Sequence, residues 1–146
     1  MFKWSGGHFV KLQSLQTYGA WDVTSVANAN SGTSTNTDSF IYKWDGGRFV
    51  LFQSIATRGA VAWHPFVISG QTFLGVANHH GDSQKHNTHS VVYQASGSRL
   101  VNYQEIPTHG ATDMTSFEYQ GSPYLAVANY YNCQKHNINS ALYKWV

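Results

Sequence analysis

The sequence has little of several features that define whole classes of protein. It contains one cysteine, Cys133, among 146 residues, so the disulfide framework of many small secreted domains is excluded. No apolar run reaches the 18 residues that a membrane-spanning helix needs. The N-terminal stretch MFKWSGGHFV also lacks the charged and then apolar pattern of a signal peptide. We therefore expect no membrane span, and an export signal either lies outside this piece or does not exist.

Charged residues are scarce, and their signs nearly cancel. They make up 11% of the chain, and the formal net charge is +2. A nucleic-acid-binding protein needs a stripe of Lys and Arg, whereas the nine basic residues here are scattered singly. We therefore expect no nucleic-acid partner. Aromatic residues reach 15% beside many Asn, Ser, Thr and Gly, a composition typical of β-rich and turn-rich extracellular proteins.

The chain also has no convincing 3.6-residue apolar stripe, so we expect almost no helix. Instead, it repeats itself. The hairpin-like stretch YKWDGGRFVLFQSI (42–55) has a near copy at 2–15 and a weaker copy at 93–106. The triplet Val-Ala-Asn recurs in steps of 50 and 51 residues, at 26–28, 76–78 and 127–129. A period of this length is the signature of a repeat architecture.

Each period contains four β-type segments separated by turn residues. In the best-preserved copy they are 60–68, 72–78, 90–95 and 99–106. Four antiparallel strands in a repeat of about 50 residues predict a β-propeller blade. The expected fold is therefore all-β, a partial β-propeller of four-stranded antiparallel blades. A glycine follows the fourth strand in each unit (Gly19, Gly59 and Gly110), where the chain must cross sharply to the next blade.

The first unit is shorter than the others. Val26 lies seven positions after Gly19, whereas Val76 lies 17 positions after Gly59. The missing ten residues correspond to the end of the innermost strand, its turn and the start of the second strand. We expect this unit to be irregular.

The repeated residues resemble a known family. Y-K-W-D-G-G-x-F-V-x-F-Q-x-I, followed by T-x-G-A, then L-x-V-A-N and H-N-x-x-S-x-[IVL]-Y-K-W, is similar to the EAR repeat, also called the EPTP or epitempin repeat. Such repeats occur in the leucine-rich glioma-inactivated proteins and in the thrombospondin-type laminin G domain and EAR repeat protein. The resemblance covers nearly the whole chain and implies a propeller built of seven such repeats.

This chain holds about three repeats, which predicts a partial array. The expected units are 2–41 with the ten-residue gap, 42–92, 93–142, and the start of a further unit at 143–146. A closed propeller usually needs four to eight blades. One way to cover the exposed sheet edges is for two chains to pair as a homodimer that closes a ring.

Histidines gather in NHHGDSQKHNTH, residues 78–89. The imidazoles and the carboxylate of this stretch are of the types that bind zinc or copper, but their spacing along the chain fits no fixed ligand pattern. His86 and His136 occupy matching positions in two repeats, each followed by Asn. We therefore favour a structural role, with these side chains bonding the loop backbone.

Two carboxylates, Asp22 and Asp113, fall three residues after the crossing glycines, on the expected innermost strand. Innermost strands line the central channel of a propeller, where facing carboxylates hold a hard cation such as Ca²⁺. The alternative is a carboxylate solvated in a wet channel, which we favour because the second unit has Ala62 at that position.

Other repeated side chains have a structural interpretation. The second strand of each unit ends in an asparagine, at Asn28, Asn78 and Asn129. A side-chain amide at a strand end forms hydrogen bonds with the backbone groups that the strand leaves unpaired. The aromatic residues at matching positions suit packing between blades, although exposed rings also stack on sugars. They are Trp4, Trp44, Trp145, Phe9, Phe49, Phe52, Tyr42, Tyr93 and Tyr143.

The sequence offers little for catalysis. It has no G-x-S-x-G and no phosphate-binding glycine loop, and GGHFV and GGRFV are hairpin turns. Cys133 beside Lys135 and His136 resembles an activated thiol, but the matching loops lack it. We expect no enzyme activity.

The family resemblance implies an extracellular, secreted or cell-surface protein that binds other proteins in adhesion or receptor-ligand contacts. Loop residues that differ between repeats are the candidates for touching a partner protein, namely His79, His80, Asp82, Tyr130 and Tyr131. The alternative is a lectin-like module that binds glycans through several weak sites.

Overall fold

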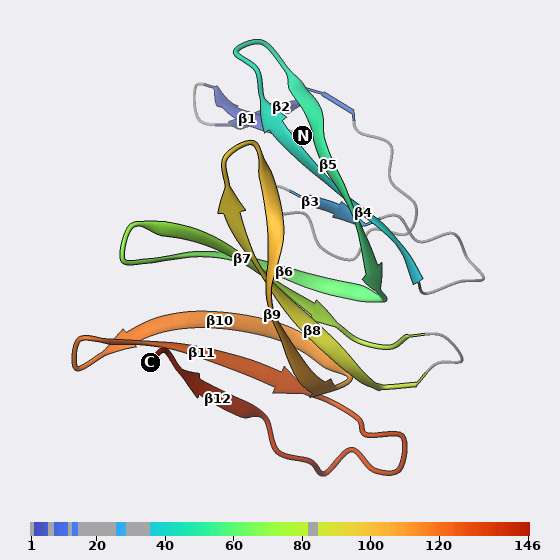
Figure 1. The fold of residues 1–146 in the computed structure, drawn as a ribbon. Coiled ribbons are helices and arrows are strands. Elements are labelled where there is room, and N and C mark those ends of the chain that lie inside the picture. Colours follow the sequence, from blue (N-terminus) through green and yellow to red (C-terminus); the bar gives the residue numbers. More distant parts are fainter. Residues whose placement is uncertain (1, 6–7, 12, 15–25, 29–35, 82–84) are drawn as a thin grey trace.

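The computed structural model describes residues 2–5, 8–11, 13–14, 26–28, 36–81 and 85–146. Their regular structure is entirely β (Figure 1). The strands are β1 (Phe2–Ser5), β2 (His8–Lys11), β3 (Val26–Asn28), β4 (Asn36–Trp44), β5 (Phe49–Arg58), β6 (Ala60–Ile68), β7 (Gln71–Asn78), β8 (Asn87–Ser96), β9 (Arg99–His109), β10 (Ala111–Tyr119), β11 (Ser122–Asn129) and β12 (Ala141–Lys144).

The strands form four antiparallel sheets in chain order. β6 to β9 make a complete four-stranded meander, and the described parts of the other sheets are β1–β2, β3–β4–β5 and β10–β11–β12. The segments predicted at 60–68, 72–78, 90–95 and 99–106 coincide with β6 to β9 within a few residues. The fold class predicted from the repeat is therefore confirmed, as blades of a partial propeller.

Tight hairpin turns fix the register within each blade. Ile68 pairs with Gln71, so only Ser69 and Gly70 form the loop between β6 and β7. Both loop residues have positive φ, 50° and 77°. This is the turn that matches the right-handed twist of paired strands. The alternating apolar residues of the two strands are thereby held on fixed faces.

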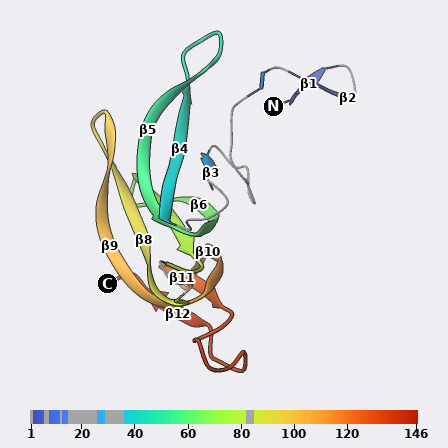
Figure 2. The same ribbon diagram turned by 90° about the vertical axis from the view of Figure 1, so that its right-hand side faces the viewer.

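The hydrophobic core lies between sheets. One cluster joins Ile41 and Ile55 of the β3–β5 sheet to residues of the β6–β9 sheet such as Trp63 and Val76. A second cluster joins the other face of β6–β9, through Phe73, to Met114 of the β10–β12 sheet. The hairpins β4–β5 and β8–β9 lie side by side (Figures 1 and 2). Each blade is thus stabilised mainly by its neighbours, as in other repeat proteins.

The aromatic residues expected between blades divide into two groups. Tyr93 is buried, and Phe52 and Tyr143 pack against the inter-sheet clusters. The prediction was wrong for Trp44, whose side chain is 49% exposed. Trp44 and Phe49 form the last pair before the turn of their hairpin, so the indole packs on Phe49 in its own hairpin, with ring centroids 5.0 Å apart. Two of the predicted side chains, Trp4 and Phe9, lie outside the described side chains.

The crossings between blades require glycine, as predicted. Gly59 lies between β5 and β6 with φ of 56°, and a Cβ there would lie 2.6 Å from the backbone oxygen of His80. Gly110 repeats this geometry between β9 and β10, with φ of 57° and the oxygen of Tyr131 at 3.1 Å. The third crossing glycine, Gly19, lies outside the described residues, as does the ten-residue gap of the first unit.

Candidate functional site

The loops between the second and third strands gather at one end of the sheets, beside the crossings (right-hand side of Figure 1). They bring four of the five predicted partner-binding residues together. These are His79 and His80 after β7, and Tyr130 and Tyr131 after β11. The fifth, Asp82, lies outside the described residues.

These side chains form a connected ring cluster with His86 and His136. His86 lies at its centre, with ring centroids 4.8 Å from His79, 5.4 Å from His80 and 4.9 Å from Tyr131. The imidazole of His136 stacks on Tyr131 at 4.5 Å and lies 4.6 Å from Tyr130. We call these six residues the loop cluster. It spans two adjacent blades.

Backbone hydrogen bonds hold the loop cluster on the crossings. The N–H of His79 donates to the oxygen of Gly59 at 3.0 Å, and the N–H of Gly110 donates to the oxygen of His86 at 2.6 Å. The N–H of Tyr130 donates to the oxygens of His109 and Gly110 at 3.0 and 3.1 Å. The loops are therefore fixed to rigid elements.

The strand-end asparagines join neighbouring blades. Oδ1 of Asn78 accepts the N–H of Arg58 at 3.2 Å, and Nδ2 of Asn78 donates to the oxygen of His89 at 2.8 Å. Asn129 repeats the pattern in the next blade. Its Oδ1 accepts the N–H of His109 at 2.9 Å, and its Nδ2 donates to the oxygen of Asn139 at 3.0 Å. The predicted role at strand ends is confirmed for Asn78 and Asn129, with the addition that each side chain bridges two sheets.

Three histidines of the loop cluster are poorly solvated. Nδ1 of His79, His80 and His86 is buried and has no hydrogen-bond partner among the described residues. Burial lowers the pKa of His79, and the neighbouring His86 and His80 lower it further. The pKa of His80 is lowered mainly by burial and then by His86. Both imidazoles are therefore neutral at neutral pH.

The role predicted for His86 differs from the one found. Its ring does not bond the loop backbone through Nδ1 but packs among the other rings. Its backbone makes the polar contacts, with the N–H donating to Sγ of Cys133 at 3.1 Å. Because Nδ1 of His80 faces Gly59 and Nδ1 of His86 faces Gly110, the two nitrogens do not converge. Among the described residues, no group of three His, Cys, Asp or Glu is placed to hold a metal ion.

The innermost strands carry a polar contact that the sequence did not reveal. Nε2 of His64 on β6 accepts the N–H of Ser116 on β10 at 3.0 Å and lies 2.9 Å from the Ser116 hydroxyl. The pKa of His64 is lowered by burial and partly restored by Asp113. Oδ1 of Asp113 accepts the N–H of Met114 at 2.8 Å. Asp22 lies outside the described residues, so a calcium ion between the two carboxylates stays a prediction.

Sequence reasoning also missed a repeated glutamine that lies on or just after the outer strands. Nε2 of Gln53 donates to the oxygen of Leu100 at 3.0 Å, and its Oε1 accepts the Leu100 N–H at 2.8 Å. Gln13 bonds the backbone of Phe49 in the same way: its Nε2 donates to the Phe49 oxygen at 3.1 Å, and its Oε1 accepts the Phe49 N–H at 3.0 Å. We call this arrangement the glutamine bridge. The signal was present in the sequence, since Gln recurs at matching positions of the repeat, at 13, 53 and 104.

Comparison with known proteins decides the family. Residues 48–94 and 99–146 each match the EPTP domain. The chain belongs to the EPTP family. Two relatives of this EPTP chain share the name thrombospondin-type laminin G domain and EAR repeat-containing protein. The protein from Homo sapiens is 44% identical over 88 residues, and that from Mus musculus is 43% identical over 88 residues.

The EPTP chain is short beside these relatives. The matched segment covers 59% of this chain and 13% of the length of each relative. Within the part of the EPTP chain that the structure describes, no helix is long and apolar enough to cross a membrane.

Proposed function

We propose that this EPTP chain is a non-catalytic module that binds another extracellular or cell-surface protein through the loop cluster. The observation that carries the proposal is the combination of fixed backbone and variable side chains. The loops follow the same Val-Ala-Asn triplet, but one continues with His79 and His80 and the other with Tyr130 and Tyr131. A rigid scaffold that presents different rings is suited to specific recognition.

The exposure of Tyr130 supports this choice of surface. Its side chain is 50% exposed although its backbone is held by two hydrogen bonds. An aromatic residue whose backbone is already ordered loses less conformational entropy on binding than a mobile one, so more of its contact energy appears as affinity. Tyrosine is also enriched among the residues that dominate binding energies.

The same surroundings argue against catalysis. The Sγ of Cys133 accepts a backbone N–H from His86, and the ring of His136 packs between Tyr130 and Tyr131. A nucleophilic thiol instead needs a base within hydrogen-bond reach. The names of the relatives describe domains and repeats, not a reaction. An extracellular location is proposed on the same names.

The test is a binding screen against an array of purified extracellular domains, with a matched pair of variants. Tyr130→Ala is expected to weaken binding of the captured partner at least tenfold, as truncating a central aromatic residue does. Tyr119→Ala, which removes a tyrosine that is 58% exposed near the β10–β11 turn, is expected to leave binding unchanged. Equal losses in the two variants would place the surface elsewhere.

A glycan array tests the alternative, a lectin-like module that binds sugars. Binding of simple sugars, with no protein captured, would replace the proposal by a lectin-like function. Binding of protein and silence on the glycan array would support the proposal.

A further inference from the structure

A polar cleft of about 320 Å³ lies between the outer hairpins of two neighbouring blades, β4–β5 and β8–β9. The two hairpins lie side by side in Figure 2, and both are complete among the described residues. The lining residue Asn78 directly precedes His79 of the loop cluster, and the lining residue Arg58 directly precedes a crossing glycine. The cleft therefore begins beside the loop cluster and continues outward between the hairpins.

Each wall of the cleft carries a carboxylate. Asp38 on β4 accepts a hydrogen bond from the hydroxyl of Ser54 through Oδ2 at 2.5 Å. Glu105 on β9 accepts one from Nδ2 of Asn102 through Oε1 at 3.3 Å. These contacts occupy one oxygen of each carboxylate and fix its position. The second oxygen of each has no hydrogen-bond partner among the described residues, so both carboxylates keep an acceptor for a cationic donor.

The positive charge in the cleft does not neutralise these carboxylates. Arg58 is the only lysine or arginine among the lining residues. Its backbone N–H bonds Asn78, but its guanidinium forms no ion pair with either carboxylate among the described residues. At a pH where His89 is neutral, two carboxylates therefore stand against one guanidinium, and the cleft has an excess of negative charge.

A buried hydroxyl also indicates a missing ligand. Tyr93 lines the cleft although it is only 8% exposed, and its ring stacks on Trp63 with centroids 6.2 Å apart. Its hydroxyl has no hydrogen-bond partner among the described residues. Burial and then Glu105 raise the pKa of Tyr93, so this hydroxyl stays protonated and neutral at neutral pH. A buried hydroxyl without a partner costs free energy, which a ligand in the cleft would recover.

The repeat itself does not require the carboxylates. The position of Glu105 is occupied by Ser54 in the preceding blade, and the position of Asp38 is occupied by His89 in the next blade. Tyr93, in contrast, is matched by a tyrosine in both neighbouring units. A charge needed for the stacking of blades would recur with the tyrosine. The two carboxylates are therefore particular to this cleft.

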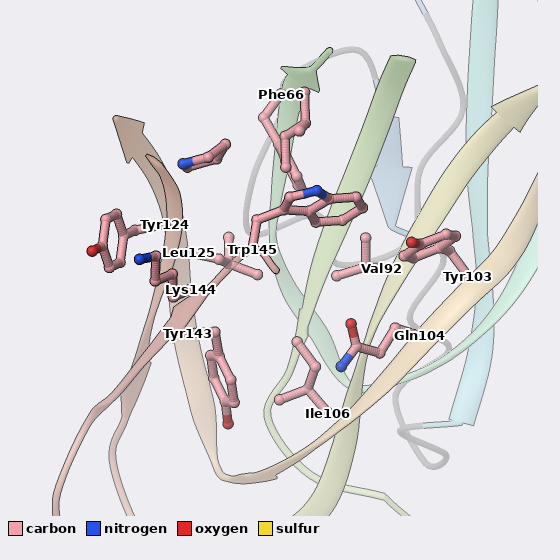
Figure 3. A pocket seen from close by; sticks show the side chains of 12 residues that line it. Phe66, Val92, Tyr103, Gln104, Ile106, Tyr124, Leu125, Tyr143, Lys144 and Trp145 are labelled. Atoms are coloured by element: carbon pink, nitrogen blue, oxygen red, sulfur yellow. The ribbon is translucent and has the colours of Figure 1, made fainter. Parts of the chain in front are cut away.

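The pocket between β6–β9 and β10–β12 differs from the cleft in its chemistry. It has a volume of about 110 Å³, and its lining includes Ile106, Tyr143 and Trp145 (Figure 3). The only charged residue in that lining is Lys144. A cation in this pocket would meet a lysine and no carboxylate. Of the two sites, the cleft is the one suited to a cation.

We propose that the cleft binds an arginine side chain of the partner protein, with the guanidinium between Asp38 and Glu105 and donating to the hydroxyl of Tyr93. The statement that the arginine belongs to a protein rests on the proposed function, since the cleft begins beside the loop cluster. A guanidinium has five N–H donors in a fixed fork, so it can reach both walls and the hydroxyl at once. The carboxylates would repel an acidic side chain. A metal ion is disfavoured because no group of three His, Cys, Asp or Glu among the described residues is placed to hold one.

The experiment titrates the 146-residue chain with Nα-acetylarginine amide at low ionic strength and follows the backbone amide signals by NMR. We expect the shifted signals to be those of the cleft, including Tyr93 and Glu105, with a dissociation constant on the order of millimolar. Nα-acetylcitrulline amide has nearly the same shape without the charge. It is expected to bind about tenfold more weakly, because its interactions with the carboxylates are not charge-assisted.

Variants of the cleft give the sign of each contribution. Glu105→Gln and Asp38→Asn each remove one negative charge at an exposed position and are expected to weaken binding of the probe about threefold. Arg58→Met keeps the apolar stem, removes the competing charge and is expected to strengthen binding about threefold. Glu118→Gln, at an exposed carboxylate on β10 outside the cleft, is the matched control and leaves binding unchanged. The spectrum of each variant also shows that it is folded.

Three outcomes would overturn the proposal. They are the absence of shifts at the cleft, equal binding of the citrulline analogue, and weaker binding by Arg58→Met. None of these outcomes bears on the loop cluster, because the titration needs no captured protein. A chain that binds the arginine probe but captures no extracellular domain would instead refute the proposed function and leave the cleft as a site for a cation.

Discussion

The two interfaces between sheets differ along their outer edges. Between β3–β5 and β6–β9 the glutamine bridge from Gln53 to Leu100 closes the edge. Between β6–β9 and β10–β12 the equivalent Gln104 lines an open pocket. The buried clusters beneath are alike in kind. Among the described residues, the bridge is thus formed where the sheets on both sides of the interface contribute an outer strand.

The largest expected effect comes from removing a large side chain from the hydrophobic core between β6–β9 and β10–β12. Phe73 is 1% exposed and contacts Phe66, Tyr103 and Trp145. Phe73→Ala is expected to lower the free energy of unfolding by about 3–5 kcal/mol, because it leaves a cavity that the sheets cannot fill. Phe117→Ala, at a phenylalanine that is 44% exposed, is expected to lower it by about 1 kcal/mol or less. Similar losses in urea unfolding would mean that the second cluster is not a core.

A crossing glycine gives the next largest effect. Gly59 and Gly97 have nearly the same φ, 56° and 59°, but only Gly59 is crowded, by the backbone oxygen of His80. Gly97→Ala is expected to cost about 1–2 kcal/mol for its backbone conformation alone. Gly59→Ala adds the clash and is expected to cost roughly 3 kcal/mol or more. Equal losses in thermal unfolding would contradict the close approach at the crossing.

The glutamine bridge itself supplies a smaller and more discriminating test. Gln53→Ala is expected to cost about 1–3 kcal/mol of unfolding free energy, since two hydrogen bonds to Leu100 are lost. Gln104→Ala is expected to cost nothing measurable, because Gln104 lines a pocket and forms no such bridge among the described residues. A loss of the same size at both positions would remove the distinction between the closed and open interfaces.

The smallest effect is that of pH. The pKa values of His79 and His80 are lowered in the folded chain below the ordinary value of 6.5, chiefly by burial. The unfolded chain then binds more protons than the folded chain as the pH falls through about 6.5. Stability is therefore full above this pH, declines below it, and levels off once the folded histidines are also protonated. Urea midpoints at several pH values measure this decline, and His80→Phe is expected to flatten it. A midpoint that rises on acidification would contradict the buried neutral histidines.

Much of the fold was predictable from the sequence, because it depends on features that repeat. Strand alternation, the turn at Ser69 and Gly70, and the crossing at Gly59 each follow from local chemistry that recurs with the period. The strand-end roles of Asn78 and Asn129 also followed from their repeated positions, whereas their hydrogen bonds to the neighbouring sheet did not. The exposure of Trp44 could not be predicted in this way. A repeated aromatic residue shows that the position recurs, but it does not show whether the neighbouring sheet extends far enough to cover the side chain.

The candidate site was predictable only in part. Variation after the Val-Ala-Asn triplet pointed to His79, His80, Tyr130 and Tyr131, which the fold brings together. The central place of His86 was not foreseen, because the sequence does not show how its own loop folds back on His79 and His80 or that Tyr131 of the next blade lies against it. The contact of His64 with Ser116 was missed for the same reason. The glutamines were visible as a repeat, but their bonds to the next blade become apparent only in three dimensions.

Hydrogen exchange at the Leu100 amide tests most directly the claim that the glutamine bridge joins neighbouring blades. The N–H of Leu100 donates to Oε1 of Gln53 at 2.8 Å, so Gln53→Ala is expected to speed exchange at Leu100 under native conditions. Exchange at Val76, inside the paired strands of the same sheet, is expected to stay unchanged. An unchanged rate at Leu100, or an equal acceleration at Val76, would contradict the bridge.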